Sequence, residues 1–176
     1  TPYLRENIGM VLQEPFLFSR SIAENISIAG EKVDMTAVRE ASRAACLDET
    51  VEGFTQGYDT FVGERGVTLS GGQKQRAAIA RTLMRRQPIM IFDDSLSAVD
   101  TETDAKIRAE LERRFGSASI ILISHRITTL AKAGQILVLD KGRIAERGTH
   151  DELVAANGIY RKIYDIQTAG AEEAAK

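Results

Sequence analysis

The sequence predicts an α/β fold in which helices cover both faces of a mostly parallel sheet. Three short apolar runs, at residues 8–12, 89–92 and 120–123, support this prediction. Continuous apolar runs of this length are typical of buried strands, and helical patterns separate them along the chain. With 176 residues, 43% of them hydrophobic, the chain is long enough for a single domain with a sizeable core.

The composition excludes several classes of function. The formal net charge is −2 and the isoelectric point is near 5.8, so no overall basic field attracts nucleic acid, and we expect no nucleic-acid partner. No apolar run approaches the ~18 residues that span a bilayer. The single cysteine, Cys46, cannot form an intrachain disulfide, which fits a reducing compartment.

Residues 69–100 form the most informative stretch, because one helix there joins two features suited to phosphate chemistry. Ser70 is expected to cap this helix, and Gln73 lies where it completes a capping box. Gly71 and Gly72 allow another molecule to approach the backbone closely. An uncovered helix N-terminus attracts anions, so this end of the helix is a candidate phosphate site.

At least one polar side chain comes after each predicted strand. Gln13 follows the first strand, Asp93 and Asp94 the second, and His125 the third. Any one of them alone is more often a structural group than a functional one. Ligands of open α/β sheets bind beyond the carboxyl ends of the strands, so we expect these four side chains to gather at one edge.

Residues 1–29 form the first expected segment, with the first strand and one helix. A Glu-Pro pair ends regular structure after the strand. The apolar residues 16–18 lie in this turn region, where they either pack internally or meet a partner. Ser21 and Glu24 form a capping box, so a short helix should run to about Ile28.

Residues 30–69 are expected to form an α-helical subdomain, because no strand pattern occurs until its last part. Asp34 and Asp48 suit the starts of two expected helices, at residues 34–45 and 48–52. The final loop contains glycines and the charged pair Glu64 and Arg65, which by default is a solvated turn.

Residues 70–167 alternate between strand and helix. A helix is expected from Asp100 or Thr101 to Gly116, with one buried stripe of large apolar residues. The elements expected after the third strand are a short helix to residue 133, strands at 135–139 and 143–146 joined by a tight hairpin, a helix from residue 149 and a last helix after residue 158. The Ala- and Glu-rich tail, 168–176, is expected to fray.

Three motifs together resemble the nucleotide-binding domain of ATP-binding cassette (ABC) transporters. LSGGQ at residues 69–73 is similar to the family signature, IMIFDD at 89–94 to the Walker B strand, and SAVD at 97–100 to the D-loop. The resemblance implies the P-loop NTPase (RecA-like) fold, with a mostly parallel sheet flanked by helices and an inserted α-helical subdomain.

The phosphate loop of that fold, G-x-x-x-x-G-K-[ST], does not occur in this sequence. In the family this loop lies upstream of the motifs found here. We therefore expect the chain to be a fragment that covers about the last two-thirds of the family's domain. By itself, such a fragment should bind ATP very weakly and be inactive.

The resemblance implies ATP and Mg²⁺ as cofactors and gives each site residue a role. Asp93 and Gln13 would hold the magnesium ion, and Gln13 and His125 would lie on opposite sides of the γ-phosphate. Asp94 would take the catalytic position. The residues that would contact the nucleotide held by a second nucleotide-binding domain are Ser70, Gly71, Gly72, Gln73 and Asp100.

Asp94 departs from the family pattern, because hydrolytic sites of the family carry glutamate at this position. Aspartate is shorter by one methylene, and a displacement of about 1 Å can cost on the order of a hundredfold in rate. We expect the chain's own site to be slow, while its signature serves the partner's site. This arrangement resembles the degenerate half of a heterodimeric exporter, with a homodimer as the alternative.

The segment EPFLFSRSIAENI, residues 14–26, is most similar to exporters. The resemblance implies a place at the cytoplasmic face of the membrane, where coupling helices of a transmembrane domain would contact Gln13–Phe18 and Glu64. One alternative is a soluble ABC ATPase of DNA repair, chromosome organisation or translation, although its usual coiled-coil insertions and basic patches are missing here. The others are an importer subunit and a regulatory subunit that donates its signature without hydrolysing ATP.

Overall fold

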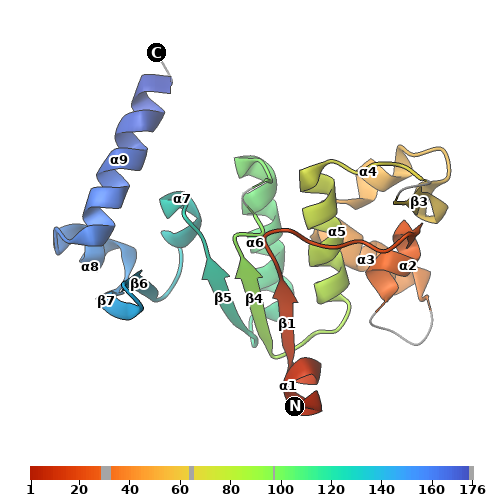
Figure 1. The fold of residues 1–176 in the computed structure, drawn as a ribbon, viewed down its shortest axis with the longest axis horizontal. Helices are drawn as coiled ribbons and strands as arrows, with labels where there is room; N and C mark the ends of the chain where they lie inside the picture. Colours follow the sequence, from red (N-terminus) through yellow and green to blue (C-terminus); the bar gives the residue numbers. More distant parts are fainter. Residues whose placement is uncertain (29–32, 64–65, 97, 175–176) are drawn as a thin grey trace. The chain divides into compact units, whose positions relative to one another are not determined.

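A computed structural model describes residues 1–28, 33–63, 66–96 and 98–174 (Figure 1). The chain divides into two compact units, Thr1–Ile123 and Ser124–Lys176. The first unit begins with a short helix, α1 (Pro2–Asn7), and contains a parallel sheet and the helices packed on it. The second unit contains an antiparallel hairpin and three further helices among the described residues.

The sheet of the first unit has three strands. β4 (Ile89–Asp93) lies between β1 (Ile8–Val11) and β5 (Ser119–Ile123), and β4 is parallel to both neighbours. The chain between β1 and β4 forms several helices, and α6 (Thr101–Phe115) connects β4 to β5. The predicted α/β fold with a parallel sheet is therefore confirmed.

Among the described residues of the first unit, helices cover only one face of this sheet. Val11, Met90 and Phe92 are buried in one core with side chains of α5 (Gly71–Leu83) and α6. On the other face, Met10 and Ile121 lie on either side of Ile91 in register and are 53% and 48% exposed. The prediction that helices cover both faces is not met within the first unit as described, since the alternate side chains of these apolar strands point away from its helices.

The helical segment predicted at residues 30–69 contains α3 (Met35–Ala44), α4 (Asp48–Glu52) and a short 3₁₀ helix, η1 (Gly57–Asp59). It is preceded by α2 (Ile22–Ser27), which starts with the predicted capping box. A two-stranded antiparallel ribbon, formed by β2 (Arg20–Ser21) and β3 (Phe61–Val62), joins the two ends of this region. The sequence did not predict the ribbon.

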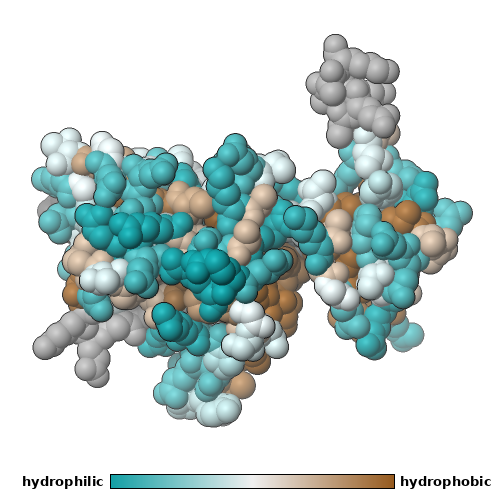
Figure 2. Space-filling model, turned by 180° about the vertical axis from the view of Figure 1, so that it is seen from behind, coloured by the Kyte–Doolittle hydropathy of each residue, from teal (hydrophilic) through white to brown (hydrophobic). Residues whose placement is uncertain are grey.

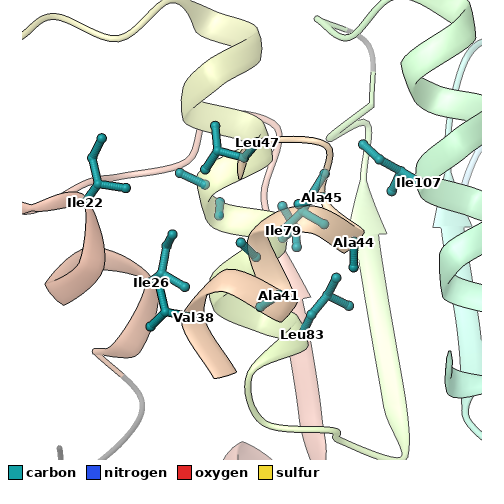
Figure 3. Packing of buried hydrophobic residues seen from close by; sticks show 14 of the residues in the cluster. Ile22, Ile26, Val38, Ala41, Ala44, Ala45, Leu47, Ile79, Leu83 and Ile107 are labelled. Atoms are coloured by element: carbon teal, nitrogen blue, oxygen red, sulfur yellow. The ribbon is translucent and has the colours of Figure 1, made fainter. Parts of the chain in front are cut away.

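Helix α5 lies at the centre of the first unit's core. Ile79 and Leu83 of α5 meet Ala41, Ala44 and Ala45 at the end of α3 (Figure 3). Small side chains on both helices let the two backbones approach closely, and α2 packs against the same helix through Ile22 and Ile26. The signature helix is therefore packed firmly over its second half. The outer surface seen in Figure 2 is mostly hydrophilic.

The second unit contains the predicted hairpin, β6 (Ile136–Asp140) with β7 (Arg143–Gly148), whose turn residues Lys141 and Gly142 have φ values of 48° and 75°. Two positive φ values are typical of a tight hairpin turn. The helices of this unit are α7 (Ile127–Leu130), α8 (His150–Ala155) and α9 (Ile159–Ala174).

Helix α9 continues through most of the tail that was expected to fray. It runs to Ala174, and the Oγ1 of Thr168 donates to the carbonyl oxygen of Tyr164 within it. Alanine and glutamate are strong helix formers, which explains how the helix continues. No helix among the described residues is long and apolar enough to cross a membrane.

Candidate functional site

The first turn of α5 has the predicted capping box. The backbone N–H of Gln73 donates to the Oγ of Ser70 at 3.3 Å, and the N–H of Ser70 donates to the Oε1 of Gln73 at 2.8 Å. Ser70 and Gly71 are exposed, while most of the helix from Gln75 to Leu83 is buried in the core. A firmly held helix thus presents its positive end to solvent.

The two glycines of the signature have different surroundings. A Cβ on Gly72 would lie 2.9 Å from the carbonyl oxygen of Ala98, which is tighter than real contacts allow. A Cβ on Gly71 would have Ala98 Cβ as its nearest neighbour, at 4.0 Å. Gly72 is therefore needed for packing inside this chain, whereas Gly71 is open on its outer side.

The two aspartates lie at the carboxyl end of β4. Asp93 is the last residue of the strand, and the backbone N–H of Asp94 donates to the carbonyl oxygen of Ile123 at 2.8 Å. Asp94 has a φ of 43°, in the left-handed region that aspartate tolerates better than most residues. Both aspartates are half-buried, so solvent reaches their carboxylates. The strand and the hydrogen bond to Ile123 fix the backbone positions from which the two side chains extend.

Gln13 leaves the sheet at the same edge as these carboxylates. It lies two residues after Val11, which is paired with Phe92 of β4, the residue before Asp93. Its side chain is exposed, and its carbonyl oxygen accepts a hydrogen bond from the Nε2 of Gln75 on α5 at 3.1 Å. The structure therefore brings Gln13, Asp93 and Asp94 to neighbouring strand ends.

The backbone of the segment after Gln13 is hydrogen-bonded to Arg81 of α5. Arg81 donates through Nη1 to the carbonyl oxygen of Phe16 at 2.9 Å and through Nε to that of Asn25 at 2.8 Å. Burial lowers the pKa of Arg81, which nevertheless stays protonated as arginines do. Phe16 and Phe18 pack edge to face with ring centroids 5.0 Å apart, and Phe16 remains 69% exposed.

Replacing Asn25 by alanine should lower the free energy of unfolding by about 1–3 kcal/mol. Asn25 is 1% exposed, and its side chain accepts from the N–H of Phe18 at 2.8 Å and donates to the carbonyl oxygen of Phe18 at 2.9 Å. Alanine would leave these backbone groups without that partner. Denaturant unfolding measures the loss, with Asn7→Ala as the control, since Asn7 is only half-buried and its side chain donates to the carbonyl oxygen of Tyr3 within α1. An equal effect of both substitutions would contradict the role given to Asn25.

Asp100 caps α6, as the sequence predicted. Its Oδ1 accepts from the backbone N–H of Thr103 at 2.9 Å. This hydrogen bond is the main reason why the pKa of Asp100 is lowered, and the carboxylate is exposed and ionised at neutral pH. The structure thus gives Asp100 a structural role within the chain, beside the nucleotide contact that the resemblance implies.

His125 belongs to the second unit and follows β5 by two residues in the sequence. Its side chain is exposed, and its carbonyl oxygen accepts from the Nε2 of Gln167 on α9 at 2.6 Å. The Oε1 of Gln167 accepts from the N–H of Ile127 at 2.9 Å, so one amide holds both sides of the histidine's loop. Sequence reasoning missed Gln167, which carries no motif.

The predicted site residues therefore fall into four groups. Gln13, Asp93 and Asp94 lie at one sheet edge, Ser70–Gln73 lie at the start of α5, Asp100 lies at the start of α6, and His125 lies in the second unit. Glu64 and Ser97 lie outside the described residues. A cavity of about 470 Å³ lined by residues of α3, α5 and α6, such as Arg43 and Phe115, contains none of the site residues.

Comparisons with known proteins point to one family. The family model described as "ABC transporter" matches residues 1–97. The uncharacterized ABC transporter ATP-binding protein YknU of Bacillus subtilis is 48% identical over 164 residues, which make up 93% of this chain and 28% of that protein. The ATP-dependent lipid A-core flippase of Haemophilus influenzae is 43% identical over 168 residues, or 95% of this chain and 29% of the flippase.

A solved structure gives the same result for the fold. A bacterial Atm1-family ABC exporter with ATP bound matches with a TM-score of 0.90 and 40% sequence identity, over 94% of this chain and 29% of that chain. The chain thus spans less than a third of the length of each of these three proteins.

Proposed function

Because the chain belongs to the ABC transporter family, we propose that it is part of the ATP-hydrolysing domain of an exporter. Its fold is that of an exporter nucleotide-binding domain, a P-loop NTPase fold. One observation carries the proposal: a single unit combines the exposed N-terminus of α5 at Ser70 with the carboxylates Asp93 and Asp94 at a strand end. These are the parts that phosphoryl transfer to water needs apart from the phosphate cradle.

Magnesium is the metal that these residues fit. No group of three or more His, Cys, Asp or Glu side chains among the described residues could enclose a metal ion. Magnesium does not require such a group, because it keeps several waters and binds through few carboxylates together with substrate phosphates. Asp93 and the side-chain oxygen of Gln13 supply hard oxygen atoms at adjacent strand ends. A bound magnesium ion would neutralise phosphate charge there.

Asp94 is the residue proposed to orient the attacking water. Its backbone is fixed by the hydrogen bond to Ile123, so the side chain starts from a defined point. An aspartate at this point reaches less far than a glutamate, which makes slow hydrolysis at this site the expected outcome. His125 would donate a hydrogen bond to the γ-phosphate, which a neutral imidazole can do.

The signature is proposed to act on the nucleotide of a second nucleotide-binding domain. Ser70 and Gly71 are exposed at the positive end of α5, while Gly72 faces Ala98 of the same chain. An anion bound at this end would complete the other domain's site. A heterodimer in which this chain has the slow site fits Asp94 best, and a homodimer would contain two slow sites.

The surface proposed to meet the transmembrane domain is the segment Gln13–Phe18. Phe16 and Phe18 are 69% and 41% exposed, and Arg81 fixes the backbone beneath them. Exposed aromatic side chains on a rigid backbone suit a partner helix. Such a partner would place the domain at the cytoplasmic face of a membrane, and Glu64 is proposed as a second contact.

Among the alternatives, a subunit that only donates its signature is the one with a specific observation in its favour. Asp94 would weaken the chain's own site, while the capping box at the start of α5 is intact. An importer subunit or a soluble ABC ATPase is less favoured, because the relatives reported above include a flippase and an exporter.

The proposal is tested with the full-length protein and its partner domain, purified and placed in lipid vesicles. ATP hydrolysis that stops when magnesium is chelated and resumes when it is restored is the expected result. Vanadate trapping of labelled ATP then shows which of the two domains hydrolyses. Absence of magnesium-dependent hydrolysis from the whole complex would contradict the proposal, whereas trapping only in the partner would support the signature-donor alternative.

A further inference from the structure

A buried amide on the signature helix connects two loops that lie far apart in the sequence. Gln75 is 3% exposed, although glutamine is usually a surface residue. Its Nε2 donates to the carbonyl oxygen of Gln13 at 3.1 Å, and its Oε1 accepts from the backbone N–H of Ala98 at 3.2 Å. Both ends of one side chain are thus used, and both partners are backbone groups.

These two backbone groups belong to the loops that carry the proposed chemistry. Gln13 is proposed to supply a side chain for the chain's own nucleotide, and Ala98 lies two residues before Asp100. Ala98 also packs its carbonyl oxygen against Gly72, in the first turn of α5. The start of α5, the loop at Gln13 and the loop at Ala98 are therefore joined within one small region.

We propose, on the basis of the function proposed above, that Gln75 is a positioning residue that holds the loop at Gln13 and the loop at Ala98 in fixed positions relative to the signature. The amide suits this task because it donates with one end and accepts with the other in a rigid plane. Breaking either hydrogen bond would leave the buried amide of Gln75 with an unpaired polar atom, which is costly, so the three segments are held together. Gln75 touches neither nucleotide nor metal in this scheme.

The alternative is that Gln75 only stabilises the fold. Several other side chains of α5 are buried and would do so, including Thr82, which is 8% exposed and whose Oγ1 donates to the carbonyl oxygen of Ala78 within the helix at 3.1 Å. Thr82→Val removes a buried hydrogen bond without contacting either loop. It is therefore the matched control for a substitution at Gln75.

The test replaces Gln75 by methionine, which has a similar length and no hydrogen-bonding amide, in the full-length protein with its partner. We expect kcat for ATP hydrolysis to fall by about tenfold, because small misplacement of reacting groups is costly. The KM for ATP should stay within about twofold, since an interaction lost only in the transition state lowers kcat. Thr82→Val should keep the kcat of the unmodified protein.

A second measurement reads the contact directly and does not depend on activity. Hydrogen exchange of the segment that contains Ala98 should become faster in Gln75→Met, since its N–H loses the Oε1 acceptor, and should be unchanged in Thr82→Val. Equal kcat values and equal exchange in the two variants would overturn the inference. If the unmodified complex hydrolyses no ATP, the proposed function fails, whereas an active complex that is indifferent to Gln75→Met refutes only this inference.

Discussion

Replacing Asp94 by glutamate is expected to raise ATP hydrolysis at the chain's own site by up to about a hundredfold. The added methylene moves the carboxylate by about 1 Å from a backbone that the hydrogen bond to Ile123 keeps in place. The left-handed φ of 43° favours aspartate over glutamate, so the variant should also be slightly less stable. Aspartate at this position thus suits the left-handed backbone, but its side chain is shorter than efficient hydrolysis is expected to require.

The measurement uses the full-length protein and a partner whose own catalytic carboxylate is changed to its amide, so that turnover comes from this chain's site. Asp94→Asn keeps the shape and the backbone preference but removes the charge, and it should abolish the remaining activity. Asp93→Glu adds the same methylene to the neighbouring carboxylate and should lower activity, because Asp93 is proposed to hold the metal. A rise with Asp93→Glu, or none with Asp94→Glu, would contradict the roles given to the two aspartates.

Local patterns predicted most elements of the fold correctly. The capping boxes at Ser21, Ser70 and Thr149 each start a helix at the predicted residue, since such a cap depends on groups only three residues apart. The three apolar runs became β1, β4 and β5 in a parallel sheet. The first strand ends at Val11, one residue before the predicted Leu12.

The elements that the sequence did not predict depend on distant partners. The ribbon of Arg20–Ser21 with Phe61–Val62 has only two residues in each strand, and neither has a strand pattern of its own. The open face at Met10 and Ile121 was also missed. An apolar run indicates that a strand can be buried on both faces, but it does not say whether the described chain supplies a cover for each.

The site shows the same division between local and distant information. The ends of β4 and of β1 follow from strand positions, so the neighbourhood of Asp93, Asp94 and Gln13 could be predicted. The hydrogen bonds of the Gln75 amide could not be predicted, because their partners are 62 and 23 residues away in the sequence. Gly72 was singled out as a nucleotide contact, which stays a prediction, and its close contact with Ala98 of the same chain was not foreseen.

Replacing Gly71 by alanine is expected to reduce ATP hydrolysis at the partner's site by about a hundredfold without harming the fold. An added Cβ at Gly71 would have its nearest neighbour at 4.0 Å, and alanine favours a helix more than glycine does. Among the described residues the methyl group would make no close contact, so the contact that it would disturb is the proposed one with the partner's nucleotide. The melting temperature should therefore stay the same or rise.

Gly72→Ala is the matched comparison, because its Cβ would lie 2.9 Å from the carbonyl oxygen of Ala98. Backbone must shift to relieve this contact, so this variant should lose about 1–3 kcal/mol of stability along with its activity. Hydrolysis by the full-length complex and thermal unfolding of each variant are measured side by side. Normal hydrolysis by a folded Gly71→Ala complex would show that the start of α5 does not approach a nucleotide, because a phosphate bound there leaves no room for the extra methyl group.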